Sequence, residues 1–149
     1  VVRNRQLYLI PQNSRMTKGI ALSDILTKLG KSKAKETVVV IDACRAAAEK
    51  GVAPKIVPPL KPPDHTAVFL SCSDGEKSYP GEDGDQSLYT KCFIEALRDL
   101  AAGGEAVTAR ILHAKIAELM GGATKGKRQT PQLKITEGQD VVLIPAAGR

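Results

Sequence analysis

Four short runs of β-branched and apolar residues alternate with stretches of helical periodicity along this 149-residue chain. The runs cover residues 6–10, 37–42, 67–72 and 141–144, and we predict a β-strand at each. Residues 37–42 read Thr-Val-Val-Val-Ile-Asp, nearly all β-branched and without alternation. This pattern is typical of a strand buried on both faces of a parallel sheet.

Apolar residues that recur three and four positions apart predict three helices, over residues 22–29, 93–101 and 112–120. Ser87 or Thr90 is the expected N-cap of the second helix, and Thr108 that of the third. The expected stop signals are the glycines that follow, namely Gly30, Gly103-Gly104 and Gly121-Gly122. Strands and helices in this order predict an α/β fold layered around a sheet. Residues 51–64 carry five prolines, which predicts an extended connector.

Composition narrows the class of protein. The length suits one domain, and the absence of any run of 18 apolar residues leads us to expect no membrane-spanning segment. Three cysteines, an odd number in a chain that does not need disulfides, favour reduced thiols and a cytoplasmic location. Aromatic residues make up 3% of the chain, which argues against a surface that stacks nucleic-acid bases.

The net charge of +6 is unevenly distributed. Residues 74–85 contain five acidic residues and one lysine, whereas basic residues cluster at residues 31–35 and 125–128. The acidic segment can attract a basic ligand or a cation, or it can be a solvated loop. The basic clusters are most simply solvated loops, although phosphate contact would also suit them.

Two cysteines follow predicted strands, where ligands bind in open α/β sheets. Cys44 comes two residues after the strand at 37–42, next to Arg45, whose charge would favour a thiolate. Cys72 ends the strand at 67–72, and Cys92 lies within a predicted helix, where it is most simply a packed side chain. Cys44 is therefore the better candidate nucleophile, with a buried structural cysteine as the alternative.

Five segments of the chain resemble the caspase and metacaspase superfamily. Residues 38–45, Val-Val-Val-Ile-Asp-Ala-Cys-Arg, are similar to its nucleophile segment, in which a hydrophobic strand runs into Asp-x-Cys or Gln-Ala-Cys-Arg. Residues 69–79 resemble the next strand and loop of bacterial caspase-like domains, and residues 87–97 the helix after it. Residues 128–132 resemble the Gln-x-Pro segment before the last strand, and residues 6–11 the hairpin that follows the family's histidine. The segments occur in the family's order.

The resemblance implies a three-layer α/β/α fold with a mostly parallel central sheet. It also implies a cysteine endopeptidase with a Cys–His dyad, in which Cys44 attacks the peptide carbonyl and its own backbone N–H stabilises the oxyanion. Metacaspase-like members carry Asp two residues before the cysteine and cleave after Arg or Lys, whereas caspases carry Gln there and cleave after Asp. Asp42 thus predicts a polypeptide substrate with a basic P1 residue, bound in an S1 pocket that Ser71 and Asp74 also line. The alternative for Asp42 is a helix cap or a hydrogen bond to a loop amide.

The chain departs from the family at the catalytic histidine, which lies in a Gly-His-Gly-type segment before the hairpin. Its two histidines are His65, expected at the end of the sheet opposite Cys44, and His113, expected on a helix flank. We therefore expect residues 1–149 to be the carboxyl-terminal part of one caspase-like domain, whose amino-terminal part supplies the histidine as a covalent or processed partner. The alternative is a catalytically inactive scaffold or regulatory module.

The sequence does not decide whether Ca²⁺ activates this protein. Many metacaspases are activated by Ca²⁺, and Glu82, Asp83 and Asp85 offer the oxygen ligands that this ion prefers. Their spacing matches no site of the family, so no metal ligand is assigned and the cofactor stays open, with activation by Ca²⁺ as one possibility.

Overall fold

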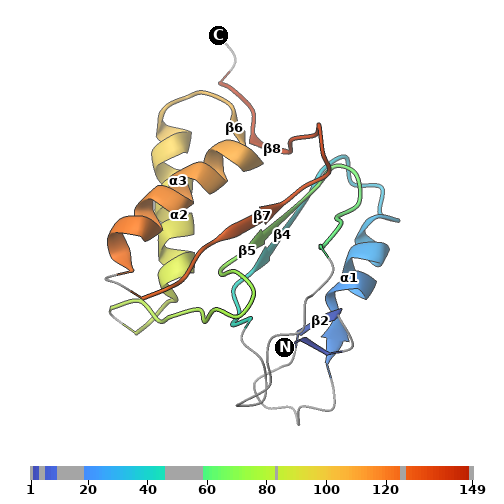
Figure 1. Ribbon diagram of the computed structural model, residues 1–149. Coiled ribbons are helices and arrows are strands. Elements are labelled where there is room, and N and C mark those ends of the chain that lie inside the picture. Colours follow the sequence, from blue (N-terminus) through green and yellow to red (C-terminus); the bar gives the residue numbers. More distant parts are fainter. Residues whose placement is uncertain are drawn as a thin grey trace.

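The computed structural model describes residues 2–3, 6–9, 19–45, 59–82, 84–124 and 127–147 (Figure 1). Its central sheet has the order β4 (Thr37–Ile41), β5 (Thr66–Leu70) and β7 (Gln132–Lys134). β4 and β5 are parallel, with Thr37 opposite Thr66, and β7 runs antiparallel to β5, with Leu70 opposite Gln132. The carboxyl ends of β4 and β5 therefore lie at the same edge of the sheet.

Helices cover both faces of this sheet (Figure 1). On one face, α2 (Leu88–Ala102) and α3 (Ala109–Ala123) pack over Ala67 and Phe69 of β5. On the other face, α1 (Leu22–Leu29) and β2 (Gln6–Leu9) pack over Val68 and Leu70. Every residue of β5 is buried, because its alternate side chains enter two different cores. The layers confirm the predicted α/β/α fold.

β4 does not match the prediction of a strand buried on both faces. Val38 and Val40 are 41% and 47% exposed, whereas Ile41 is buried. Val38 and Val40 pair with Ala67 and Phe69, so they lie on the face of the sheet that α2 and α3 cover at β5 and leave open at β4. Among the described residues, β4 pairs with β5 and with no strand on its other side. Within this described part of the chain, β4 is an edge strand with an apolar composition.

The helix caps confirm most of the predicted boundaries. The hydroxyl of Ser87 accepts a hydrogen bond from the N–H of Thr90 at 2.9 Å, and that of Thr108 accepts one from Ile111 at 3.4 Å. α2 ends at Ala102 with Gly103 as its C-cap, and Gly104 follows with a φ of +72°, which favours glycine.

The predicted stop of α3 is wrong, because the helix continues through Gly121 and Gly122 to Ala123. Each glycine in a helix costs about 1 kcal/mol relative to alanine. Burial of Leu112, Ile116 and Met120 on the packed face outweighs this local cost.

Short strands complete the fold. β1 (Val2–Arg3), β2 and β3 (Ile20–Ala21) form a small antiparallel sheet. The predicted strand at residues 141–144 is present as β8 (Val142–Ile144), but it pairs with β6 (Val107–Thr108) instead of joining the central sheet. The sequence did not predict β1, β3, β6 or β7, because none of these two- or three-residue strands lies in a run of four apolar residues like the one at residues 141–144. Of the proline-rich connector, residues 51–58 lie outside the described part of the chain.

Candidate active site

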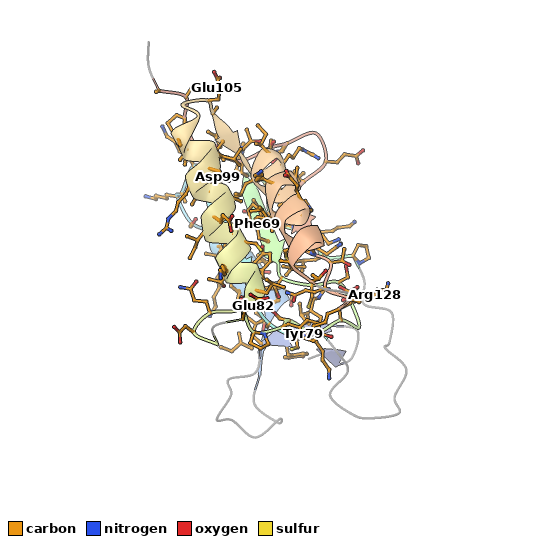
Figure 2. All side chains as sticks on the ribbon, turned by 90° about the vertical axis from the view of Figure 1, so that its left-hand side faces the viewer. Phe69, Tyr79, Glu82, Asp99, Glu105 and Arg128 are labelled. Carbon is orange, nitrogen blue, oxygen red and sulfur yellow. The ribbon has the colours of Figure 1, made fainter. Side chains whose placement is uncertain are left out.

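The ends of β4 and β5 bring together two segments that the sequence predicts to be functional. Asp42, Ala43 and Cys44 follow β4, and Ser71 and Cys72 follow β5. Two further segments reach the same end of the molecule: the loop between β5 and α2, and the residues that precede β7. Figure 2 shows Tyr79, Glu82 and Arg128 of these segments together at this end, while Asp99 lies farther along α2 and Glu105 beyond its end.

Three hydroxyl groups surround the carboxylate of Asp42. The hydroxyl of Ser78 donates to Oδ1 at 2.6 Å, and that of Thr90 donates to Oδ2 at 2.7 Å. The hydroxyl of Ser87 also donates to Oδ2. Ser87 is the N-cap of α2, so the carboxylate lies at the positive end of this helix dipole. Asp42 thus supports the start of α2 through two side chains, and it is still exposed to solvent.

Cys44 is exposed at the same surface and contacts the backbone of Ser78. The N–H of Ser78 lies 3.4 Å from Cys44 Sγ, and the thiol lies 3.6 Å from the carbonyl oxygen of Ser78. Ser78 therefore touches both predicted functional side chains, Cys44 through its backbone and Asp42 through its hydroxyl. Sequence patterns do not single out Ser78, because it lies 34 residues from Cys44 in a loop without periodicity.

The side chain of Ser71, which we expected to line the S1 pocket, contacts the backbone of Ala43 instead. Its hydroxyl donates to the carbonyl oxygen of Ala43 at 3.3 Å and accepts from the N–H of Ala43 at 3.1 Å. It is fully buried. Ser71 therefore fixes the backbone between Asp42 and Cys44, and its predicted role in binding P1 stays a prediction.

Asp74 forms an ion pair with Arg45. The guanidinium of Arg45 also donates to the carbonyl oxygen of Cys72 at 3.3 Å, and Arg45 is buried. We expected the positive charge of Arg45 to favour a thiolate at Cys44. In the structure, this charge is paired with Asp74 instead. The thiol of Cys72 is itself buried, which raises its pKa and suits a packed side chain.

Glu76 is a buried carboxylate that the sequence analysis did not single out. Its Oε2 accepts hydrogen bonds from the N–H groups of Ser73 at 3.1 Å and Thr130 at 2.7 Å. Its Oε1 accepts from the Thr130 hydroxyl at 3.2 Å and from Arg128 Nε at 2.8 Å. Burial by itself would raise the pKa of Glu76, but these hydrogen bonds outweigh it and the pKa is lowered. Glu76 joins the loop after β5 to the segment before β7.

Gln129 lies next to this contact and is also buried. Its Nε2 donates to the carbonyl oxygen of Ser71 at 3.1 Å and to the hydroxyl of Ser78 at 3.3 Å. Its Oε1 accepts from the N–H of Tyr79 at 3.0 Å. The side chain of Gln129 thereby connects the end of β5 to the residues that contact Asp42 and Cys44.

Neither histidine of the chain is placed as a partner of Cys44. His65 precedes β5, and its carbonyl oxygen accepts from the N–H of Thr37 at the start of β4, a full strand length from Cys44. His113 lies on α3, where burial and then the charge of Lys134 lower its pKa. The described residues also contain no group of three His, Cys, Asp or Glu side chains that could hold a metal ion, and Asp83 lies outside them.

A family model for the caspase domain matches residues 3–142. The chain belongs to the caspase domain family. In this caspase domain, Asp42 and Cys44 lie in the segment that resembles the family's nucleophile segment, and the fold positions both at the carboxyl end of β4. Membership makes the chain part of a family of cysteine peptidases. None of the curated proteins matches it. In the described part of the chain, no helix of this caspase domain is long and apolar enough to cross a membrane.

Proposed function

We propose that this caspase domain cleaves polypeptides after Arg or Lys, with Cys44 as the nucleophile and Asp42 as the acceptor for the P1 side chain. One observation carries the proposal: both side chains are exposed at the end of β4, and Ser78 contacts both. A carboxylate can accept about four hydrogen bonds, and Asp42 already accepts three from hydroxyls. It therefore retains one acceptor position for an ammonium or guanidinium group.

The proposed hydrolysis begins with the thiol of Cys44. Cys44 Sγ attacks the carbonyl carbon of the scissile peptide bond, and the backbone N–H of Cys44 donates to the oxyanion that forms. A histidine takes the thiol proton and gives it to the departing amine, which leaves an acyl group on Sγ. Water then hydrolyses the thioester and releases the acid. The acidic residues of the loop that contains Asp74 and Asp85 raise the local concentration of basic substrates.

The histidine belongs, in this proposal, to the amino-terminal part of the same domain, which pairs with β4. No strand of the described residues pairs with the outer edge of β4, and Val38 and Val40 are exposed; both observations support this placement. A parallel strand added beside β4 would end at the same edge as Cys44, so a histidine just after that strand would reach the thiol. The three free cysteines support a reducing, cytoplasmic location.

Peptide cleavage by the full-length protein tests the proposal. Fluorogenic peptides that end in Arg, Lys or Asp are compared for the wild type, Cys44→Ala and Asp42→Asn, with Cys92→Ala as the control for losing a buried thiol. We expect cleavage after Arg and Lys that Cys44→Ala abolishes and Cys92→Ala preserves. Asp42→Asn should lower kcat/KM for basic peptides about 100-fold, since it removes a charged partner. Equal rates for wild type and Cys44→Ala would refute the proposal.

The second candidate function is a catalytically inactive caspase-like module that acts as a scaffold. The placement of His65 and His113 away from Cys44 favours it. No cleavage of any of the three peptides by the full-length protein would support the scaffold over the peptidase.

A further inference from the structure

The side chain of Gln129 has a fixed orientation. Its Oε1 faces a donor, the N–H of Tyr79, and its Nε2 faces an acceptor, the carbonyl oxygen of Ser71. A flipped amide would place donor against donor and acceptor against acceptor, so these two backbone groups determine the flip. With 5% of its surface exposed, Gln129 cannot replace either hydrogen bond with water at low cost.

This orientation also determines where the proton of Ser78 points. Gln129 Nε2 is a donor, so the Ser78 oxygen must accept from it across their 3.3 Å contact. A hydroxyl has one proton, and that proton is then available for Asp42 Oδ1, which lies 2.6 Å away. The short distance is typical of a hydroxyl that donates to a carboxylate.

The contacts that start at Gln129 reach all three residues after β4. Through the Ser78 hydroxyl they reach Asp42, and through the Ser78 backbone they reach Cys44 Sγ. Through Ser71, whose hydroxyl contacts both backbone polar groups of Ala43, they reach the residue between them. We propose that Gln129 is a positioning residue, which acts through Ser78 to keep the Asp42 carboxylate and the Cys44 thiol in a fixed relation.

The kinetic consequence of this inference rests on the proposed function. Substitution of Ser78 and substitution of Gln129 are expected to have different effects on kcat and KM. Ser78→Ala removes the hydroxyl and keeps the backbone contacts with Cys44. It should raise KM for Arg and Lys peptides about fivefold and leave kcat within about twofold, because one hydrogen bond to a charged group is lost. Gln129→Met keeps the buried volume and removes all three hydrogen bonds of the amide. It should raise KM to the same extent and lower kcat about tenfold, since the backbone at residues 78–79 is also released.

Gln129→Glu tests the direction of the Ser78 proton. A carboxylate accepts from the Ser78 hydroxyl and competes with Asp42 for its proton, so KM for basic peptides should rise more than in Gln129→Met. Adding Ser78→Ala to Gln129→Glu should remove this additional rise, because no proton remains to compete for. Gln132→Met, three residues along the chain, is the matched control, since Gln132 contacts the carbonyl oxygen of Pro131 and Lys134.

The experiment measures kcat and KM in the full-length protein, together with hydrogen exchange of the Ser78 and Tyr79 amides. The expected exchange is about tenfold faster in Gln129→Met and unchanged in Gln132→Met. Wild-type kinetics in Gln129→Met and Gln129→Glu would overturn the proposal, as would a uniform loss of kcat in all variants without any change in KM. A wild type that cleaves nothing refutes the proposed function. In that case, unchanged exchange in Gln129→Met overturns the inference, and faster exchange confined to residues 78–79 supports it.

Discussion

Replacing Glu76 by Gln should destabilise the domain by about 2–3 kcal/mol at neutral pH, because hydrogen bonds to a buried charged group contribute about 1.5–3 kcal/mol. The amide oxygen of Gln can still accept from the N–H groups of Ser73 and Thr130, which both meet Oε2. The amide nitrogen would then face Arg128 Nε, a donor, across the 2.8 Å that Oε1 now bridges. The variant therefore loses the charge and puts two donors in contact.

Arg128 provides the comparison that tests this reasoning. Its side chain is 88% exposed, so the ion pair with Glu76 is screened and should contribute less than about 1 kcal/mol. We expect Arg128→Met to be several times less destabilising than Glu76→Gln. Glu118→Gln is the control for removing a carboxylate, since Glu118 is 68% exposed in its pair with Lys115 and should change stability by less than about 0.5 kcal/mol.

The effect should also depend on pH, with a sign that follows from the lowered pKa of Glu76. A carboxyl whose pKa is lower in the folded than in the unfolded state stabilises the fold above its ordinary value of 4.5. This contribution disappears as the pH falls through the folded-state pKa. The difference between wild type and Glu76→Gln in urea unfolding should therefore shrink below that ordinary value. Equal destabilisation by Arg128→Met and Glu76→Gln, or a difference that grows on acidification, would refute the account.

Three further predictions concern other parts of the fold. Val40→Lys in the full-length protein should lower stability by about 2 kcal/mol if the amino-terminal part covers this face of β4, as measured by thermal unfolding, whereas Ile111→Lys at an exposed position of α3 should not. Ser87→Ala should lower stability by about 1–2 kcal/mol, more than Thr108→Ala, because Ser87 both caps α2 and bonds Asp42; equal losses would contradict this. Tyr89→Phe should leave stability unchanged or raise it slightly, because its buried hydroxyl has no hydrogen-bond partner among the described residues. A loss above about 1 kcal/mol would show that the hydroxyl has one.

The fold was predictable from the sequence wherever a long element carries its own periodicity. The apolar positions of α1, α2 and α3, the caps Ser87 and Thr108 and the strand β5 are all local signals. β4 shows the limit of such signals. Its run of valines indicates burial on both faces, but burial depends on which elements lie over it, and in the described residues α2 and α3 cover only its neighbours. The composition of a strand indicates that it prefers to be buried, but it does not identify the element that covers it.

The candidate site was predictable at Asp42 and Cys44, because both follow a strand that the sequence makes obvious. Ser78, Gln129 and Glu76 could not be found in this way. Each acts through contacts with residues 34 to 58 positions away in the sequence, and each is an ordinary polar residue in a loop. Glu76 shows why: an acidic residue in a loop predicts a solvated charge, and only the fold brings Thr130 and Arg128 to it.

The position of Asp42 at the start of α2 has a consequence for redesign of specificity. The hydroxyls of Ser87 and Thr90 donate to this carboxylate, and Ser87 also accepts from the first turn of α2. In the proposed function, exchanging Asp42 for a cationic residue would reverse the charge preference at P1 and, in the same step, deprive two hydroxyls at the helix start of their acceptor. Selection for acidic substrates would therefore have to alter residues 87 and 90 together with 42. Such coupling makes a gradual change of preference through single substitutions costly in stability.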